Sequence, residues 1–92
     1  MDDAASDDPQ IMFGKRLREL RLTKGVSQMQ LSFDAGLDHS YVSDTERGNR
    51  NVTLRNIYRL AKALGVAPEE LLKAPSQSAT KTADNKKGQP ES

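Results

Sequence analysis

The chain has 92 residues, no cysteine and a formal net charge of +1. This length allows one small domain without a deep substrate cleft, and the lack of cysteine excludes disulfides and thiolate chemistry. The first ten residues have neither the basic start nor the apolar run of a signal peptide, and no stretch approaches the roughly 20 apolar residues of a membrane span. We therefore expect a cytoplasmic protein without a membrane partner.

The charges divide the chain into three parts. Four aspartates lie in residues 1–10, whereas residues 11–73 hold eleven Lys and Arg against seven Asp and Glu, a net charge of +4. A basic domain suits a polyanionic partner, although a solvated surface often carries such an excess. Residues 1–10 are predicted to form a disordered acidic arm, and residues 74–92, which lack Leu, Ile, Val and aromatic residues, a disordered polar tail.

The first predicted helix covers residues 11–24 of the remaining domain, 11–73. Apolar residues in this domain recur at helical spacing with no two-residue alternation, which predicts an all-α fold. One face of the first helix carries Phe13, Leu17 and Leu20. Gly25 is expected to end it, because glycine readily adopts the left-handed conformation that closes a helix.

The second predicted helix covers residues 28–35. Ser27 is a natural N-cap, since its hydroxyl can accept a hydrogen bond from a free backbone amide of the first turn. Gln30 is expected to complete a capping box, and Gly36 to end the helix.

The third predicted helix covers residues 39–47. Asp38 is expected to cap its start, and Gly48 follows its end. Val42 and Thr45 are predicted to turn inward, which leaves the opposite face of the helix polar and exposed.

The last two predicted helices cover residues 54–64, capped by Thr53, and residues 68–73. The apolar positions of the longer helix are Leu54, Ile57, Leu60, Ala61 and Leu64. The short helix adds Leu71 and Leu72, of which at least one is expected to lie exposed in a monomer. We interpret these two leucines as a homodimer interface.

Only residues 36–38 separate the second and third predicted helices. A connection this short forces the helices to cross steeply and leaves the third one protruding, which is the arrangement of a helix-turn-helix whose second helix enters the DNA major groove. An antiparallel helix pair in an ordinary bundle can use a similar turn. Packing considerations leave both interpretations open.

Residues 26–66, VSQMQLSFDAGLDHSYVSDTERGNRNVTLRNIYRLAKALGV, resemble the helix-turn-helix domain of Cro and lambda-type phage repressors. The most specific parts are Ser27-Gln28, the Glu46-Arg47-Gly48 run and the Ala-Leu-Gly close of the fourth helix. Residues 38–43 and 50–54 are similar to restriction-modification controller proteins, which are small homodimers without a ligand domain. The resemblance implies a compact five-helix lambda-repressor-like fold and a sequence-specific transcriptional regulator.

Combined with this resemblance, the sequence suggests which side chains contact DNA bases. The first two turns of the third helix enter the groove, and the base-reading candidates there are His39, Ser40, Ser43 and Asp44. We expect His39 to donate to a guanine or a phosphate, the alternative being an exposed polar residue. Asp44 would accept a hydrogen bond from a cytosine amino group, or else pair with Arg47 within the helix.

Other polar residues are expected to contact phosphates or to support the fold. The phosphate candidates are Gln28, Tyr41, Arg47, Asn49, Arg50 and Asn51. For Tyr41 the alternative is packing on the second helix. The resemblance implies that Arg21 and Glu46 form an ion pair between the first and third helices, and Thr45, where the family has a larger apolar residue, suggests a slightly underpacked support.

The function implied is a homodimer on a pseudo-palindromic double-stranded DNA operator, with RNA polymerase as a further candidate partner in activation. The alternative is an antitoxin-like protein-interaction module that keeps the fold. The sequence contains no carboxylate pair, nucleophile and base set, metal-ligand cluster or phosphate-cradling glycine loop. We therefore expect no enzymatic activity, no cofactor and no metal.

Overall fold

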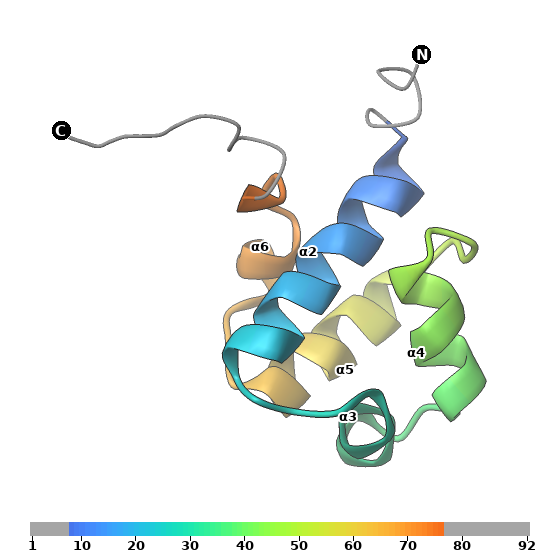
Figure 1. Ribbon diagram of the computed structural model, residues 1–92, viewed down its shortest axis with the longest axis vertical. Coiled ribbons are helices and arrows are strands. Elements are labelled where there is room, and N and C mark those ends of the chain that lie inside the picture. Colours follow the sequence, from blue (N-terminus) through green and yellow to red (C-terminus); the bar gives the residue numbers. More distant parts are fainter. Residues whose placement is uncertain (1–7, 77–92) are drawn as a thin grey trace, which may run out of the picture.

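The computed structural model describes residues 8–76. Within this range the chain forms five helices and no strand (Figure 1), which confirms the all-α prediction. The helices are α2 (Pro9–Thr23), α3 (Gln28–Ala35), α4 (His39–Glu46), α5 (Leu54–Leu64) and α6 (Pro68–Leu71). Helix α2 packs against α4 and α6, whereas α3 contacts α4 and α5, and α5 contacts α6. None of these helices is both long and apolar enough to span a membrane.

The core consists of small and medium aliphatic side chains that all five helices contribute. Its buried hydrophobic members are Leu17, Leu31, Ala35, Val42, Leu60, Ala61, Leu64 and Leu71. The expectation for Leu54 is wrong, because its side chain is 68% exposed in the first turn of α5. The buried residues of α5 are Leu60, Ala61 and Leu64, all in the second half of the helix, which contacts α3 and α6.

The start of α2 lies earlier than the apolar pattern indicates. The Asp8 side chain caps the helix by accepting from the backbone N–H of Gln10 at 2.8 Å, and Pro9 occupies the first turn, where its missing N–H is no loss. Residues 8–10 thus belong to the folded domain rather than to the arm. At the other end Pro75 is fully buried. The rest of the predicted arm and tail lies outside the described residues.

Helix α3 has the predicted ends but only half of the predicted capping box. The Ser27 hydroxyl accepts from the backbone N–H of Gln30 at 3.0 Å, and Gly36 ends the helix with a φ of 72°. The Gln30 side chain, however, donates to Asp34 one turn later at 2.9 Å. Asp38 stands at the N-cap of α4 but makes no side-chain capping bond.

Gly14 sets the closeness of α2 to the end of α4. A Cβ at this position would lie 2.3 Å from the carbonyl oxygen of Thr45 and 2.8 Å from that of Glu46. Only a residue without a side chain allows the two backbones to approach this far. Thr45 is 1% exposed, which confirms that it turns inward as predicted.

Candidate nucleic-acid interface

Helix α4 is anchored on one face and open on the other. Val42 and Thr45 point into the protein, and the Thr45 hydroxyl donates to the carbonyl of Tyr41 at 2.7 Å. His39 and Ser40, in the first turn, are both exposed. The steep turn before them is closed by a hydrogen bond of 2.9 Å from the backbone N–H of residue 37 to the carbonyl of residue 32. The fold therefore presents the start of α4 to a large partner.

A buried ion pair joins the end of α4 to α2. The Arg21 Nε donates to Glu46 Oε2 at 2.6 Å and its Nη2 to Glu46 Oε1 at 3.0 Å. The side chains are only 9% and 3% exposed, and Arg21 Nη1 also donates to the carbonyl of Val26 at 2.9 Å. The pair that the family resemblance implied thus holds three segments together: α2, the turn after it and the end of α4.

Gln28, at the start of α3, extends this network to the exposed end of α4. Its Nε2 donates to Glu46 Oε1 at 3.0 Å, and its Oε1 lies 3.2 Å from His39 Nε2. The side chain expected to meet a phosphate is therefore hydrogen-bonded within the protein, and one hydrogen of its Nε2 is not used by these contacts. Sequence inspection missed that Gln28 orients His39.

A second cluster surrounds the carboxylate of Asp44. It contains the two arginines that were expected to bind phosphate. Asp44 forms an ion pair with Arg47 and a second one with Arg50, whose Nη2 lies 3.4 Å from Asp44 Oδ2. Arg47 also donates to the Ser43 hydroxyl at 2.6 Å, and the Arg50 guanidinium lies 4.6 Å from the centre of the Tyr41 ring. We call Tyr41, Asp44, Arg47 and Arg50 the Asp44 cluster.

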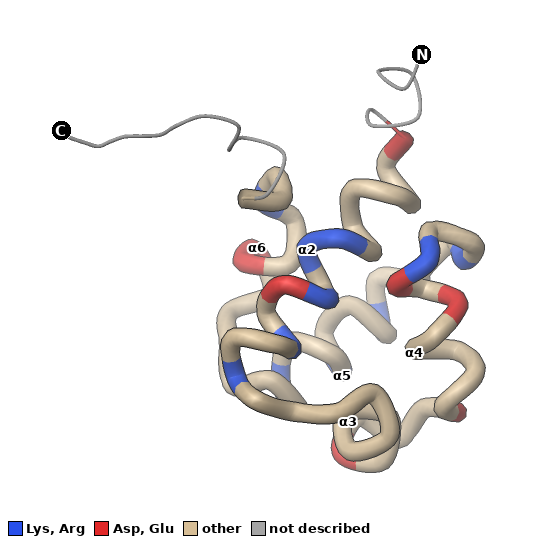
Figure 2. Tube along the Cα trace, viewed as in Figure 1, with Lys and Arg blue, Asp and Glu red and all other residues tan. Residues whose placement is uncertain are grey.

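The two halves of α4 differ in charge (Figure 2). The first half carries neither Lys nor Arg, whereas acidic and basic residues follow one another at the end of the helix and in the next loop. Of the two alternatives for Asp44, the structure of the DNA-free chain contains the ion pair with Arg47. The Tyr41 hydroxyl accepts from Asn56 Nδ2 of α5 at 2.9 Å, a contact that neither expectation for this residue included. Asn49 and Asn51 lie exposed in the loop.

The residues predicted to form a dimer interface differ sharply in exposure. Leu71 is completely buried in the core, so a partner could not reach it, whereas the neighbouring Leu72 is 63% exposed. Placing Leu71 at an interface was wrong: it packs inward from α6 together with the α5 leucines.

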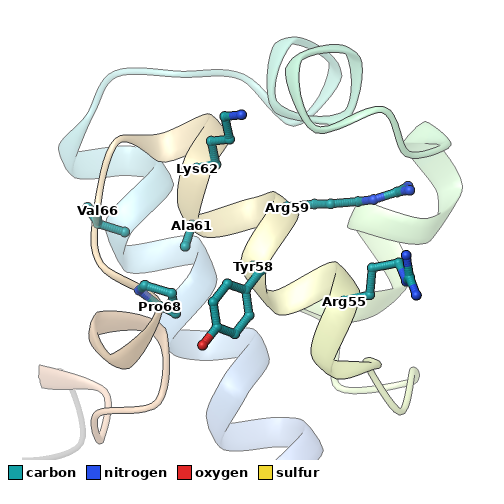
Figure 3. A pocket seen from close by; sticks show the side chains of 7 residues that line it. All are labelled: Arg55, Tyr58, Arg59, Ala61, Lys62, Val66 and Pro68. Atoms are coloured by element: carbon teal, nitrogen blue, oxygen red, sulfur yellow. The ribbon is translucent and has the colours of Figure 1, made fainter.

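A shallow groove between α5 and the start of α6 is a further surface that sequence reasoning missed. Its lining residues are Arg55, Tyr58, Arg59, Ala61, Lys62, Val66 and Pro68. Figure 3 shows the Tyr58 ring beside Pro68, with Arg55 and Arg59 extending away from it. Neither arginine forms an ion pair within residues 8–76. The sequence signal for their neighbourhood was their spacing of four residues, which places both arginines on one face of α5.

Comparison with known proteins agrees with this geometry. A family model described as a helix-turn-helix domain matches residues 12–74. The control protein C.BamHI of Bacillus amyloliquefaciens is 49% identical over 63 residues, which cover 67% of this chain and 78% of that protein. The crystal structure of the restriction-modification controller protein C.AhdI from Aeromonas hydrophila is 58% identical with a TM-score of 0.66, covering 67% of this chain and 94% of the other.

A hypothetical transcription factor from Neisseria has a similar structure, with a TM-score of 0.72 and 40% identity over 79% of this chain and 84% of the other. These findings confirm the resemblance to helix-turn-helix regulators and controller proteins, and they decide against the ordinary bundle that packing alone had left open. The chain therefore belongs to the helix-turn-helix family of DNA-binding transcriptional regulators, whose members are not enzymes.

Proposed function

We propose that the protein binds a pseudo-palindromic operator as a homodimer in the cytoplasm, with one α4 helix of each copy in the major groove. The observation that carries this proposal is the exposed, uncharged start of α4, held in place by Gln28 and followed by a loop rich in polar and basic residues. Two such helices about 34 Å apart would read successive major grooves on one face of the duplex.

Base reading is assigned to the outer face of α4 and phosphate contacts to its surroundings. The base-reading set is His39, Ser40, Ser43 and Asp44. The phosphate-binding set is Gln28, Tyr41, Arg47, Asn49, Arg50 and Asn51. A face of small polar side chains discriminates between base edges, whereas the guanidinium groups supply affinity that does not depend on sequence.

A second copy of the chain is the partner we propose for the apolar surface on the α5 and α6 side. Tyr58 is 57% exposed there and lines the groove between α5 and the start of α6. Leu72, which is 63% exposed, lines a separate groove beside α2. A domain with a single eight-residue recognition helix covers one half-site, so pairing doubles the sequence that is read. Tyr58→Asp should give a monomer in sedimentation equilibrium, and an unchanged dimer would exclude this surface.

The experiment that tests DNA binding is selection of bound fragments from a random duplex library, followed by titration of the selected duplex at several salt concentrations. We expect a two-fold symmetric motif, dissociation constants on the order of nanomolar, and at least about a tenfold loss of affinity between 50 and 200 mM salt. Equal affinity for selected and random duplexes, or binding that is insensitive to salt, would contradict the proposal.

The position of the operator decides the sign of regulation. An operator that overlaps a promoter blocks RNA polymerase, whereas one just upstream places the bound protein beside the polymerase, where a surface contact activates transcription. A promoter-reporter assay with the selected operator at both positions separates the two effects. Capture of a stable protein partner together with no retained promoter DNA would favour the antitoxin-like alternative instead.

A further inference from the structure

We infer that His39 reads DNA as a hydrogen-bond acceptor, through its Nδ1, and therefore selects the exocyclic amino group of adenine or cytosine in the major groove. The inference rests on the proposed function and specifies the base chemistry of one position of the operator. It reverses the donor role toward guanine that the sequence suggested for this residue.

The argument starts at the buried carboxylate of Glu46. Both of its oxygens accept hydrogen bonds from Arg21, at 2.6 and 3.0 Å, so the group is an ionised acceptor with no hydrogen to donate. The Gln28 amide atom that lies 3.0 Å from Glu46 Oε1 must therefore be the nitrogen. With the amide reversed, two oxygens would face each other at hydrogen-bond distance.

The orientation of the amide determines the state of the histidine. With its nitrogen turned to Glu46, Gln28 presents its oxygen to His39 Nε2 at 3.2 Å, and an amide oxygen can only accept. The hydrogen of this bond therefore belongs to His39 Nε2. A neutral imidazole carries one hydrogen, so its Nδ1 is left as an acceptor.

Each base pair presents one hydrogen-bond donor to such an acceptor in the major groove, an exocyclic amino group. Adenine presents its N6 amino group and cytosine its N4 amino group, whereas guanine presents N7 and O6 and thymine O4, all of which are acceptors. His39 is exposed at the first position of the recognition helix, the part that reaches base edges. The network from Arg21 to His39 thus converts a residue that could use either nitrogen into one with a defined preference.

The binding test uses the operator recovered by the selection experiment, at about pH 8 so that it addresses the neutral ring. The base pair read by His39 is the one at which His39→Ala loses its preference. Every base pair holds one such amino group, on its adenine or its cytosine. We expect about a fivefold loss of wild-type affinity when that adenine or cytosine is replaced by purine or 2-pyrimidinone, which lack the amino group, since one neutral hydrogen bond contributes about 1 kcal/mol. His39→Ala should show no further loss on the analogue.

Wild-type affinity that is unchanged on the analogue, at a base pair where His39→Ala weakens binding, would overturn the inference while leaving the proposed function intact. A failure to select any operator would instead contradict the proposed function. The two failures are therefore distinguishable in the same experiment.

Two further measurements test the role of Gln28. Gln28→Ala frees both imidazole nitrogens, so the preference for the natural base over its amino-free analogue should weaken. The matched variant Gln30→Ala, which removes a glutamine of the same helix that bonds Asp34 instead, should leave the preference unchanged. Independently of any variant, nitrogen NMR of the unmodified protein should show hydrogen on Nε2 and none on Nδ1 at about pH 8. Hydrogen on Nδ1 would contradict the inference.

Discussion

Replacing Asp44 by asparagine should make the protein bind DNA more tightly but less selectively. In the free chain the Asp44 carboxylate neutralises part of the charge of Arg47 and Arg50, so it occupies the place that a DNA phosphate would take. Random DNA must compete with this carboxylate for both guanidinium groups. When the two guanidinium groups turn to DNA phosphates, Asp44 loses its partners. An operator can replace them with the hydrogen bond of a cytosine amino group, whereas a random duplex does not.

The exposure of the cluster sets the size of the effect. The three side chains are 32%, 58% and 42% exposed for Asp44, Arg47 and Arg50, so each ion pair contributes at most about 1 kcal/mol to folding and the variant should fold normally. On DNA, removing one negative charge amounts to one additional phosphate contact. The slope of log K against log salt should therefore steepen by about 0.9, which corresponds to roughly three- to tenfold tighter binding of random duplex near 0.1 M salt.

Fluorescence anisotropy with a random duplex and with the selected operator, each over a range of salt, measures both quantities. Operator affinity should rise less than random-duplex affinity if Asp44 accepts from a cytosine, because the asparagine oxygen still accepts that hydrogen bond but without the negative charge that strengthens it. The matched control is Asp34→Asn, which makes the same charge change on α3, where Asp34 bonds only a glutamine within the described residues. The reasoning is refuted if random-duplex affinity stays unchanged, or if Asp34→Asn raises it equally.

Three predictions concern stability. Gly14→Ala should lower the free energy of unfolding by about 1–3 kcal/mol in urea, because the new methyl group would meet backbone oxygens of α4; an unchanged midpoint would contradict the close approach. Arg21→Met should cost about 3–5 kcal/mol by leaving Glu46 buried without its cation, and adding Glu46→Leu should recover part of this loss. A hydrogen bond from Lys73 is the main reason why the pKa of Glu70 lies below its ordinary value of 4.5. The stability that wild type gains over Glu70→Gln at neutral pH should therefore disappear in thermal melts as the pH falls below that value, and a constant difference would refute it.

Local signals in the sequence were sufficient for the helix-turn-helix itself. Ser27 caps α3 and Gly36 ends it as expected, because a capping bond and a left-handed glycine involve only residues within one turn. The same holds for Thr53 and Gly65 at the two ends of α5. The family resemblance then supplied the function of this turn, which packing considerations could not.

Other features depended on how the helices are rotated and how closely they pack. Of two adjacent leucines only Leu71 faces the core, and this follows from the orientation of α6 against α5. The need for a glycine at position 14 likewise follows only from the position of α4, whose backbone a Cβ there would meet.

The hydrogen bonds around His39, on the proposed DNA-reading face, also depend on how the helices pack. Gln28 and His39 are eleven positions apart, and Glu46 is eighteen from Gln28. Nothing in the sequence indicates that these three side chains form one hydrogen-bonded chain, because their contact exists only once α3 and α4 cross. The sequence and its family resemblance predicted that α4 enters the DNA major groove. The tertiary structure adds the contact between Gln28 and His39, from which we infer that Nδ1 is the accepting nitrogen, since a hydrogen bond to a distant amide places the hydrogen on the other one.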